Sequence, residues 1–321
     1  MSGHRLISIV TPVFNEEDSI PIYYDRLRKV LDSLQSRYRF EILFTNNRST
    51  DRSLEIIQGL RTSDASVQVL TLSRNFGYQP SLMSGIRHAI GDAIIVIDVD
   101  CEDPPELIPT FIEEWERGND LVYGDRKRRT EFFAVQLGRL AFYRLNRMLA
   151  DTEIVLDMGD FALFSRRLRD LMLANHSTFP FLRTEAAYVG FNRKGIDYKR
   201  QARSRGKSHY NFVAMIKFAA GGILSSSTFP LRIVAFLFVP FVAITTALLV
   251  LDLMRDSVPA FHLIVTLDLS YLMFAVASIA IYMARTYKNS VSRPIFIVDW
   301  EKSSVNGDRV RWTADDLPER S

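Results

Sequence analysis

Two long apolar runs near the C-terminus constrain this chain more than any other feature of its sequence. Residues 233–251 contain no charged side chain over 19 positions, and residues 263–284 contain one, Asp268, over 22 positions. Each run matches the roughly 20 residues with which a helix crosses the hydrocarbon core of a bilayer. Two buried helices of a soluble core are the alternative, but such helices rarely extend this far without a polar face. The sequence therefore predicts two transmembrane helices, at about 231–253 and 262–284.

The charges beside these runs predict how they are oriented. The connecting residues 252–262 carry one cation, Arg255, whereas the outer flanks carry many. The flanking cations are Arg200, Arg203, Arg205, Lys207, Lys217, Arg232, Arg285, Lys288 and Arg293. Because basic residues stay on the cytoplasmic side of a membrane, we expect both termini in the cytoplasm and the short turn outside. Residues 1–30 contain no signal segment, so the predicted location is the cell (inner) membrane, with the chain crossing the lipid bilayer twice.

Composition excludes several other classes of protein. At 321 residues the chain is long enough for about two structural units with a core of normal size. Its single cysteine, Cys101, excludes an intramolecular disulfide and a cysteine-based zinc site. Forty basic side chains against thirty-seven acidic ones give a net charge of +3, which is too balanced for a dedicated nucleic-acid-binding protein.

Short apolar runs alternate with amphipathic stretches in the N-terminal part of the chain. Strands are predicted at 6–10, 40–44, 67–72, 93–97 and 121–123. Helices are predicted at 18–34, 50–60, 80–90 and 105–117. Continuous apolar strands are typical of parallel sheets that are covered on both faces. The predicted fold class is therefore α/β, with a mostly parallel, Rossmann-like sheet and helices on both faces.

Polar side chains follow four of the predicted strands. Ligands of parallel α/β sheets bind beyond the carboxyl ends of the strands. The residues at these ends are Asn15 and Glu16 after the first strand, Asn46 and Asn47 after the second, Ser73, Arg74 and Asn75 after the third, and Asp98 and Asp100 after the fourth. We expect these side chains to meet at one edge of the sheet and to bind a ligand there.

The acidic segment after the fourth strand predicts a metal site. Alternate residues of an extended segment point the same way, so Asp98, Asp100 and Glu102 are expected to present three carboxylates to one side. Oxygen ligands suit Mg²⁺ or Mn²⁺, and Mg²⁺ usually shares its coordination with substrate phosphates. A solvated acidic turn before the helix at Pro105 is the alternative. The position of the segment at the end of a buried strand favours the metal site.

Two amphipathic stretches lie between the sheet domain and the first apolar run. Residues 132–149 suit a packing helix and a membrane-surface helix equally, whereas 209–224 lead directly into the first span and are predicted to lie in the membrane interface. The predicted domains are a cytosolic α/β domain at 1–205, an amphipathic juxtamembrane helix at 206–229, the two spans at 230–286, and a cytosolic C-terminal tail at 287–321.

Several motifs occur along the chain in the order typical of one family. They are SIVTPVFNEEDSI, SRNFGYQPSLMSG, DVDCEDPPEL, YGDRKRR, DMGDFALFSRR, RSRGKSHY, SSSTFPLR and SRPIFIV. With them, almost the whole chain resembles glycosyltransferase family 2 with a GT-A fold, and within it the polyprenyl-phosphate glycosyltransferases, which include dolichol-phosphate mannose synthases and bactoprenol glucosyltransferases. The resemblance implies a metal-dependent enzyme that moves a sugar from a nucleoside-diphosphate sugar donor to a polyprenyl phosphate acceptor.

The resemblance also implies roles for individual residues. Asp98, Asp100 and Glu102 would bind the Mg²⁺ or Mn²⁺ cofactor. The residues implied for the nucleotide-sugar site are Pro12, Phe14, Asn15, Glu16, Asn46, Asn47, Asn75 and Asp98.

The chain departs from the pattern of the family at three places. Asn46 and Asn47 stand where relatives commonly have two aspartates, Glu102 stands where close relatives have glutamine, and His209 stands where they have lysine. An amide at the base-contacting position still accepts and donates hydrogen bonds, but its charge is gone. These departures suggest an active site adapted to a different sugar.

The chemistry of the acceptor indicates what the enzyme must supply. A phosphate monoester has a second pKa of about 6 and is largely dianionic at neutral pH, so its oxygen attacks without a strong general base. Because guanidinium groups bind phosphate bidentately, Arg126 and Arg203 are the predicted catalytic cations, beside Asp100 at the metal. Asp160 is expected to orient the nucleophile or a sugar hydroxyl, or else to cap the following turn. A single displacement would invert the configuration of the anomeric carbon.

Resemblance alone selects UDP-glucose and an undecaprenyl phosphate-like lipid as the leading substrates, in a reaction that serves the modification of cell-envelope glycans. The same reaction with N-acetylglucosamine, mannose or an amino sugar is one alternative. A non-catalytic membrane scaffold that keeps the fold is an alternative of another class. The sequence leaves open whether the chain forms a homo-oligomer.

Overall fold

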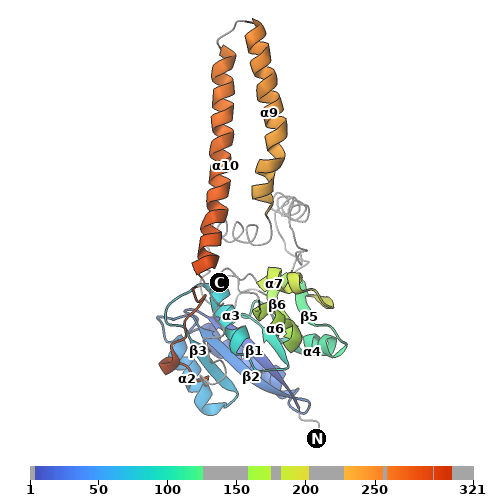
Figure 1. Cartoon of the computed structure of the whole chain (residues 1–321). Helices are drawn as coiled ribbons and strands as arrows, with labels where there is room; N and C mark the ends of the chain where they lie inside the picture. The colour runs from blue at the N-terminus through green and yellow to red at the C-terminus, as the bar shows by residue number, and fades with distance from the viewer. Residues whose placement is uncertain are drawn as a thin grey trace. The chain divides into compact units, whose positions relative to one another are not determined.

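Two compact units make up the part of the chain that the structure describes. The computed structural model describes residues 4–125, 158–174, 182–201, 228–255, 259–291 and 293–305. The described residues up to 201, together with 294–305, belong to the first unit, and those between 228 and 293 belong to the second (Figure 1).

A mixed, mostly parallel sheet forms the centre of the first unit. Its described strands are β1 (Arg5–Val13), β2 (Tyr38–Asn46), β3 (Val67–Thr71), β4 (Ala93–Val96), β5 (Leu121–Asp125), β6 (Met158–Ser165) and β7 (Arg193–Asp197). They lie in the order β3-β2-β1-β4-β6-β5-β7. β6 is antiparallel to β4 and β5, whereas the pairs formed by β1, β2, β3 and β4 among themselves are parallel. The carboxyl ends of these four strands therefore lie side by side.

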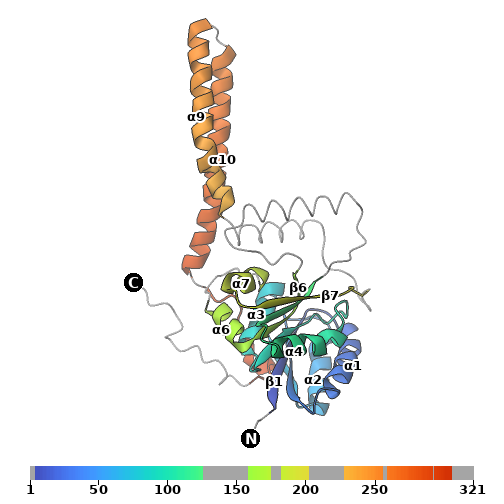
Figure 2. The same cartoon turned by 90° about the vertical axis from the view of Figure 1, so that its right-hand side faces the viewer.

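Helices cover both faces of the sheet, and Figure 2 shows them on its two sides. One core contains buried residues of α1 (Ser19–Asp32), α2 (Ser53–Ser63) and α4 (Ile108–Glu116), which the 3-10 turn η1 (Pro105–Leu107) precedes. The other core contains buried residues of α3 (Tyr78–His88), α6 (Arg166–Leu173) and α7 (Leu182–Val189). The α/β fold class that the sequence predicts is confirmed.

The apolar pattern of the sequence accounts for the elements that were predicted. In α1, Ile20, Tyr23, Leu27 and Leu31 recur at helical spacing and are fully buried. β4 is buried along its whole length, as expected for a central parallel strand. The predicted strands correspond to β1 through β5, whereas β6 and β7 were not predicted. β7 is partly exposed and begins with two charged residues, so a search for apolar runs does not find it.

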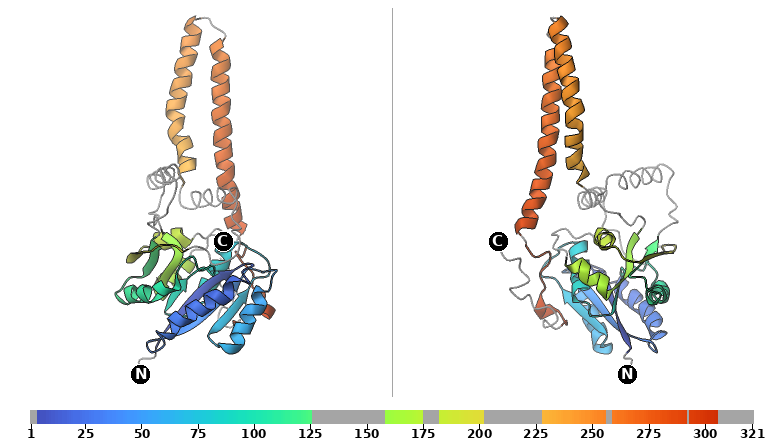
Figure 3. Two further views of the ribbon diagram at one scale, coloured as in Figure 1. Left: turned by 180° about the vertical axis from the view of Figure 1, so that it is seen from behind. Right: turned by 45° about the vertical axis from the view of Figure 1, so that its right-hand side comes forward.

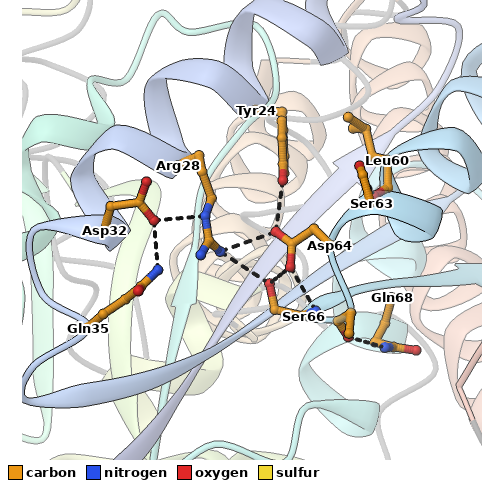
Figure 4. A network of polar contacts seen from close by, with 10 residues as sticks. Tyr24, Arg28, Asp32, Gln35, Leu60, Ser63, Asp64, Ser66 and Gln68 are labelled. Carbon is orange, nitrogen blue, oxygen red and sulfur yellow. Dashed lines mark hydrogen bonds and ion pairs between the residues drawn. The ribbon is translucent and has the colours of Figure 1, made fainter.

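A polar network joins α1 to the turn before β3 (Figure 4). Asp64 accepts hydrogen bonds from the Tyr24 hydroxyl at 2.8 Å, from Arg28 Nη1 at 3.1 Å and from the Ser66 hydroxyl at 2.6 Å. Burial alone would raise the pKa of Asp64, but the hydrogen bonds from Ser66 and Tyr24 and the charge of Arg28 outweigh it and lower the pKa. The network therefore stabilises the ionised carboxylate in the folded chain.

The residues after the last helix include a segment that packs on the sheet. Residues 294–305, named here the C-terminal strap, run along β3 and contain the short 3-10 helix η2 (Trp300–Lys302), as Figures 1 and 3 show in dark red. Phe296 and Val305 of the strap are buried, and the rings of Phe296 and Trp300 lie 6.0 and 5.8 Å from the His88 ring of α3. This part of the predicted C-terminal tail thus belongs to the core of the first unit.

Two long helices, α9 (Phe229–Arg255) and α10 (Pro259–Val291), form the described part of the second unit. The Tyr271 ring stacks on Phe241 with centroids 4.5 Å apart, and the Tyr271 hydroxyl donates to the Val234 carbonyl at 2.5 Å. None of the most apolar stretch of α9 is buried, and 11% of that of α10 is buried. Apolar side chains that face outward suit a lipid environment and do not suit the core of a soluble protein. Both helices are therefore candidate membrane spans.

Candidate active site

Three loops at the carboxyl edge of the sheet share an unusual backbone conformation. Asn15 after β1, Arg48 after β2 and Cys101 after β4 have left-handed φ angles of 56°, 62° and 59°. Such a conformation costs a non-glycine residue on the order of 1 kcal/mol and persists only where surrounding contacts enforce it, which is common at functional sites. The polar residues at the strand ends predict ligand binding at this same edge.

Asn15 ties the loop after β1 to the loop after β2. Its side-chain oxygen accepts hydrogen bonds from the Thr50 N–H at 2.8 Å and from the Thr50 hydroxyl at 3.3 Å. Its own N–H donates to Ser49 Oγ at 3.1 Å. These three contacts hold the two loops in a fixed relation to each other.

The other predicted residues of the first loop lie close along the chain. Pro12 is buried inside β1, and Phe14 is half-buried directly after it. Glu16 accepts a hydrogen bond from the Ser19 hydroxyl at 2.7 Å, at the start of α1. The structure therefore gives Glu16 a role in fixing the first turn of this helix.

Asn46, the last residue of β2, and Asn47, which follows it, are buried and hydrogen-bonded. The Asn46 side-chain oxygen accepts from the Ser49 N–H at 3.0 Å. The Asn47 amide donates to Asn75 Oδ1 at 3.0 Å, and its oxygen accepts from the Phe76 N–H at 2.9 Å. A carboxylate could accept but not donate here. The Asn47 side chain thereby joins the loops after β2 and β3 without a buried charge.

Asp98 lies just beyond β4 among other acidic side chains. The hydroxyl of Tyr78, at the start of α3, donates to Asp98 Oδ1 at 2.8 Å. Burial, together with the negative charges of Asp103, Asp160 and Asp100, raises the pKa of Asp98 to about 7. The carboxyl edge of the sheet therefore has an excess of negative charge that a cation would neutralise.

The acidic segment after β4 is a turn and not an extended segment. β4 ends at Val96, and the left-handed Cys101 interrupts the alternation on which the prediction of three parallel carboxylates depends. Glu102 instead forms an ion pair with Arg200, in which Nη1 lies 2.7 Å from Oε2, and its N–H donates to Asp100 Oδ1 at 3.0 Å. The predicted alternation is therefore wrong.

The described residues contain no group of three or more His, Cys, Asp or Glu side chains arranged to hold a metal ion. The donor set nevertheless fits a divalent cation that shares its coordination with substrate phosphates, because such sites need only one or two carboxylates from the protein. Asp98 and Asp100 would supply these oxygens, and burial together with the surrounding negative charge raises the pKa of Asp98. Glu102 is engaged by Arg200 in this structure.

Asp160 of β6 is held by an arginine that the sequence analysis did not identify. Arg183 of α7 places Nε 3.1 Å from Oδ1 and Nη2 3.3 Å from Oδ2 of Asp160. Their side chains are 26% and 13% exposed. The alternative that Asp160 caps the following turn is wrong, because Asp160 lies inside β6, which continues to Ser165, the residue whose side chain caps α6. No spacing rule links Asp160 to Arg183, and only the fold brings them together.

The predicted phosphate-binding residues Arg126 and Arg203 lie outside the described residues, as does His209. Tyr78, Arg183 and Arg200 are among the described polar residues of the candidate site that sequence reasoning missed. Tyr78 lies inside the motif SRNFGYQPSLMSG and Arg200 lies shortly before RSRGKSHY, but their roles depend on which carboxylate each side chain reaches.

Comparison with known proteins identifies the family. Residues 8–172 match Glycosyl transferase family 2. The chain belongs to this family. It is accordingly a glycosyltransferase with the GT-A fold, in a family that typically uses a divalent metal ion.

Full-length relatives carry more specific names. This glycosyltransferase is 37% identical to the prophage bactoprenol glucosyl transferase homolog of Escherichia coli (strain K12), over 91% of this chain and 98% of that protein. It is 34% identical to the bactoprenol glucosyl transferase of Shigella phage SfV, over 92% of this chain and 99% of that protein. Among solved structures, it is similar to a mannosyltransferase from Pyrobaculum calidifontis in complex with GDP-Man and Mn²⁺, with a TM-score of 0.42, 16% identity, and coverage of 90% and 88% of the two chains.

Proposed function

We propose that this glycosyltransferase moves glucose from UDP-glucose to undecaprenyl phosphate or a similar polyprenyl phosphate, on the cytoplasmic face of the inner membrane. The names of two relatives that match nearly end to end support a polyprenyl acceptor and a glucosyl group. The alternative is the same reaction with another sugar. It is favoured by Asn46 and Asn47, whose amides replace the usual carboxylates in the predicted nucleotide site.

The observation that carries the choice of acceptor is the exposure of α9 and α10. Their outward-facing apolar side chains include Phe236, Leu253 and Met273, which are 67%, 74% and 72% exposed. A water-soluble acceptor gives a catalytic domain no reason to carry such helices. A polyprenyl phosphate does, because its tail stays in the bilayer while its phosphate lies at the headgroup level.

The C-terminal strap supports a topology in which both helices cross the membrane. The strap follows α10 in the chain and is hydrogen-bonded to β3, which precedes α9. A segment and the strand it pairs with must lie on the same side of a bilayer, so the pair of helices would leave the membrane on the side where it entered. Arg232, Arg285 and Lys288 lie near these ends, and this positive charge favours the cytoplasmic side.

The reaction would be a single displacement at the anomeric carbon. One oxygen of the lipid phosphate dianion forms the new bond to this carbon while the bond from carbon to the nucleoside diphosphate breaks, and no proton need be removed. Arg126 and Arg203 would bind the acceptor phosphate, and Arg183 would hold Asp160 in place to orient the acceptor or a sugar hydroxyl. Mg²⁺ or Mn²⁺, held by Asp98 and Asp100, would stabilise the charge that develops on the departing diphosphate.

Transfer to lipid tests this proposal. Membranes containing the chain are incubated with radiolabelled UDP-glucose, and the lipids are then extracted with organic solvent. The proposal expects label in the lipid fraction that increases when polyprenyl phosphate is added. Label from a different nucleotide sugar would correct the donor, and absence of labelled lipid with every nucleotide sugar would overturn the proposal and favour a scaffold.

A further inference from the structure

The C-terminal strap completes the outer edge of the described sheet. β3 is the last strand at this end of the sheet order, and its backbone groups on the outer side bond to the strap. The backbone bonds are Ser73 N–H to Ile297 O at 2.9 Å, Asp299 N–H to Thr71 O at 2.8 Å, and Ser304 N–H to Val69 O at 2.8 Å. The hydroxyls of Ser303 and Ser304 accept from the N–H groups of Thr71 and Val69, each at 2.9 Å. The strap therefore occupies an edge that would otherwise be open to pairing.

Through Thr71, the strap also reaches the end of β2. The Thr71 hydroxyl donates to the carbonyl of Lys302 at 2.9 Å and lies 3.5 Å from Asn46 Nδ2. On the inner side of β3, the Leu72 N–H donates to the carbonyl of Asn46 at 2.9 Å. Asn46 is the residue with which the predicted nucleotide-binding loop begins.

A direct ion pair joins the strap to the same loop. Arg48 Nη1 lies 3.1 Å from Asp299 Oδ2, between residues that are 251 positions apart in the chain. Arg48 is the residue of this loop with the left-handed backbone, and its side chain is 43% exposed against 20% for Asp299. Asp299 is held in turn through its backbone, by the N–H bond to Thr71. The ion pair with Asp299 thus fixes Arg48, the strained residue that follows the two predicted nucleotide-binding asparagines in the chain.

We propose that Asp299 of the C-terminal strap is a positioning residue for the donor site, and that its ion pair with Arg48 holds the loop at 46–49 in its nucleotide-binding form. The inference rests on the proposed function only in taking this loop as the place where a nucleoside diphosphate binds. It implies that a residue beyond α10 contributes to the affinity for the donor. Acceptor binding and the chemical step would not depend on it.

An effect of Asp299 on nucleotide affinity can be distinguished from an effect on the stability of the fold. Exposed ion pairs contribute little to stability, whereas the buried side chains of Phe296 and Val305 and the backbone bonds to β3 attach the strap to the sheet. Removing the charge of Asp299 should therefore leave the strap in place and release the Arg48 side chain. The affinity for nucleotide would change while the unfolding temperature would not.

The experiment compares Asp299→Asn with Glu301→Gln and Lys302→Gln in the purified full-length chain. Glu301 is an exposed acid two residues away, and the Lys302 ammonium lies 4.0 Å from Asp299, so these variants control for local charge. The dissociation constant of UDP is measured by calorimetry with Mn²⁺ present, with GDP as a second probe, and thermal unfolding is recorded without nucleotide. We expect Asp299→Asn to weaken UDP binding about three- to fivefold, the range for a partly exposed ion pair. Both controls should bind like the wild type, and none of the unfolding temperatures should shift.

A double variant tests whether Asp299 acts through Arg48. If it does, Arg48→Gln and Arg48→Gln/Asp299→Asn should bind UDP equally weakly. An unchanged dissociation constant in Asp299→Asn, or an equal loss in Glu301→Gln, would overturn the inference. Transfer assays separate it from the proposed function, because wild-type protein that binds UDP but labels no lipid would refute the lipid acceptor alone. Wild-type protein that binds neither UDP nor GDP would refute both.

Discussion

The ion pair between Arg183 and Asp160 gives a sharp test of the candidate site. Arg183→Gln removes the positive charge and the two hydrogen bonds that hold the Asp160 carboxylate, which is 13% exposed. The charge of this carboxylate contributes to the raised pKa of Asp98. A hydrogen bond to a charged group contributes about 1.5–3 kcal/mol. Because the Arg183 side chain is 26% exposed, a value near the lower end, about 2 kcal/mol, is appropriate. If the contact is fully used in the transition state, transfer should slow by about 30-fold.

The assay measures initial rates of sugar transfer at saturating donor and acceptor, with the dissociation constant of UDP and the unfolding temperature measured beside them. Arg183→Lys keeps the charge but not the planar fork, so we expect an intermediate loss of about tenfold. Arg167→Gln is a matched control, because it breaks the 2.8 Å ion pair with Asp120 near the amino end of β4. This control should transfer at the wild-type rate.

Two outcomes bear directly on the reasoning. Combining Arg183→Gln with Asp160→Asn should slow transfer little more than the slower single variant does, because the two residues act as a pair. Transfer by Arg183→Gln within twofold of wild type, in a protein of unchanged unfolding temperature, would refute the placement of this pair in the active site.

Three further predictions follow from other parts of the structure. Asp100→Asn should lower the rate of transfer on the order of 10²-fold and raise the Mg²⁺ concentration that transfer requires. Glu102→Gln should be tolerated, because Glu102 is already paired with Arg200. Titrations of the transfer rate with metal check both predictions. Because the pKa of Asp64 is lower in the folded chain than its ordinary 3.8, its contribution to stability is present above that value and is lost as the pH falls through the folded pKa. Asp64→Asn should therefore destabilise the chain at neutral pH and flatten the loss of unfolding temperature below about pH 4, and an unchanged acid profile would contradict this. Replacing residues 229–291 by a Gly-Ser linker removes both helices and keeps the strap. This change should abolish most transfer to long-chain polyprenyl phosphate and should spare transfer to a short, water-soluble prenyl phosphate. Equal losses on both acceptors would show that the helices belong to the active site.

The parts of the fold that sequence reasoning predicted are those encoded by local pattern. The apolar strands β1 to β4 and the helical spacing of Ile20, Tyr23, Leu27 and Leu31 are visible in single segments of sequence. β7 was missed because Arg193 and Lys194 leave it without an apolar run. The pairing of the C-terminal strap with β3 was missed because it depends on a contact across more than 200 residues.

The candidate site shows the same division. The polar residues at the ends of β1, β2 and β4 were predicted because the α/β topology alone places them at one edge. The failure at Glu102 has a local cause, since one left-handed residue, Cys101, breaks the alternation of an extended strand. Arg183 and Asp299 carry no motif of their own, and each matters only through the side chain that it reaches in the folded chain.

Lipid labelling with a panel of nucleotide sugars tests glucosyl transfer to a polyprenyl phosphate most directly. Membranes with and without the chain receive radiolabelled UDP-glucose, UDP-N-acetylglucosamine or GDP-mannose, with added undecaprenyl phosphate and Mg²⁺. We expect labelled lipid from UDP-glucose, dependent on the chain, on the lipid phosphate and on the metal, and strongly reduced in Asp100→Asn. Label that stays in the aqueous phase for every donor, although the folded chain is present in the membrane, would contradict this expectation.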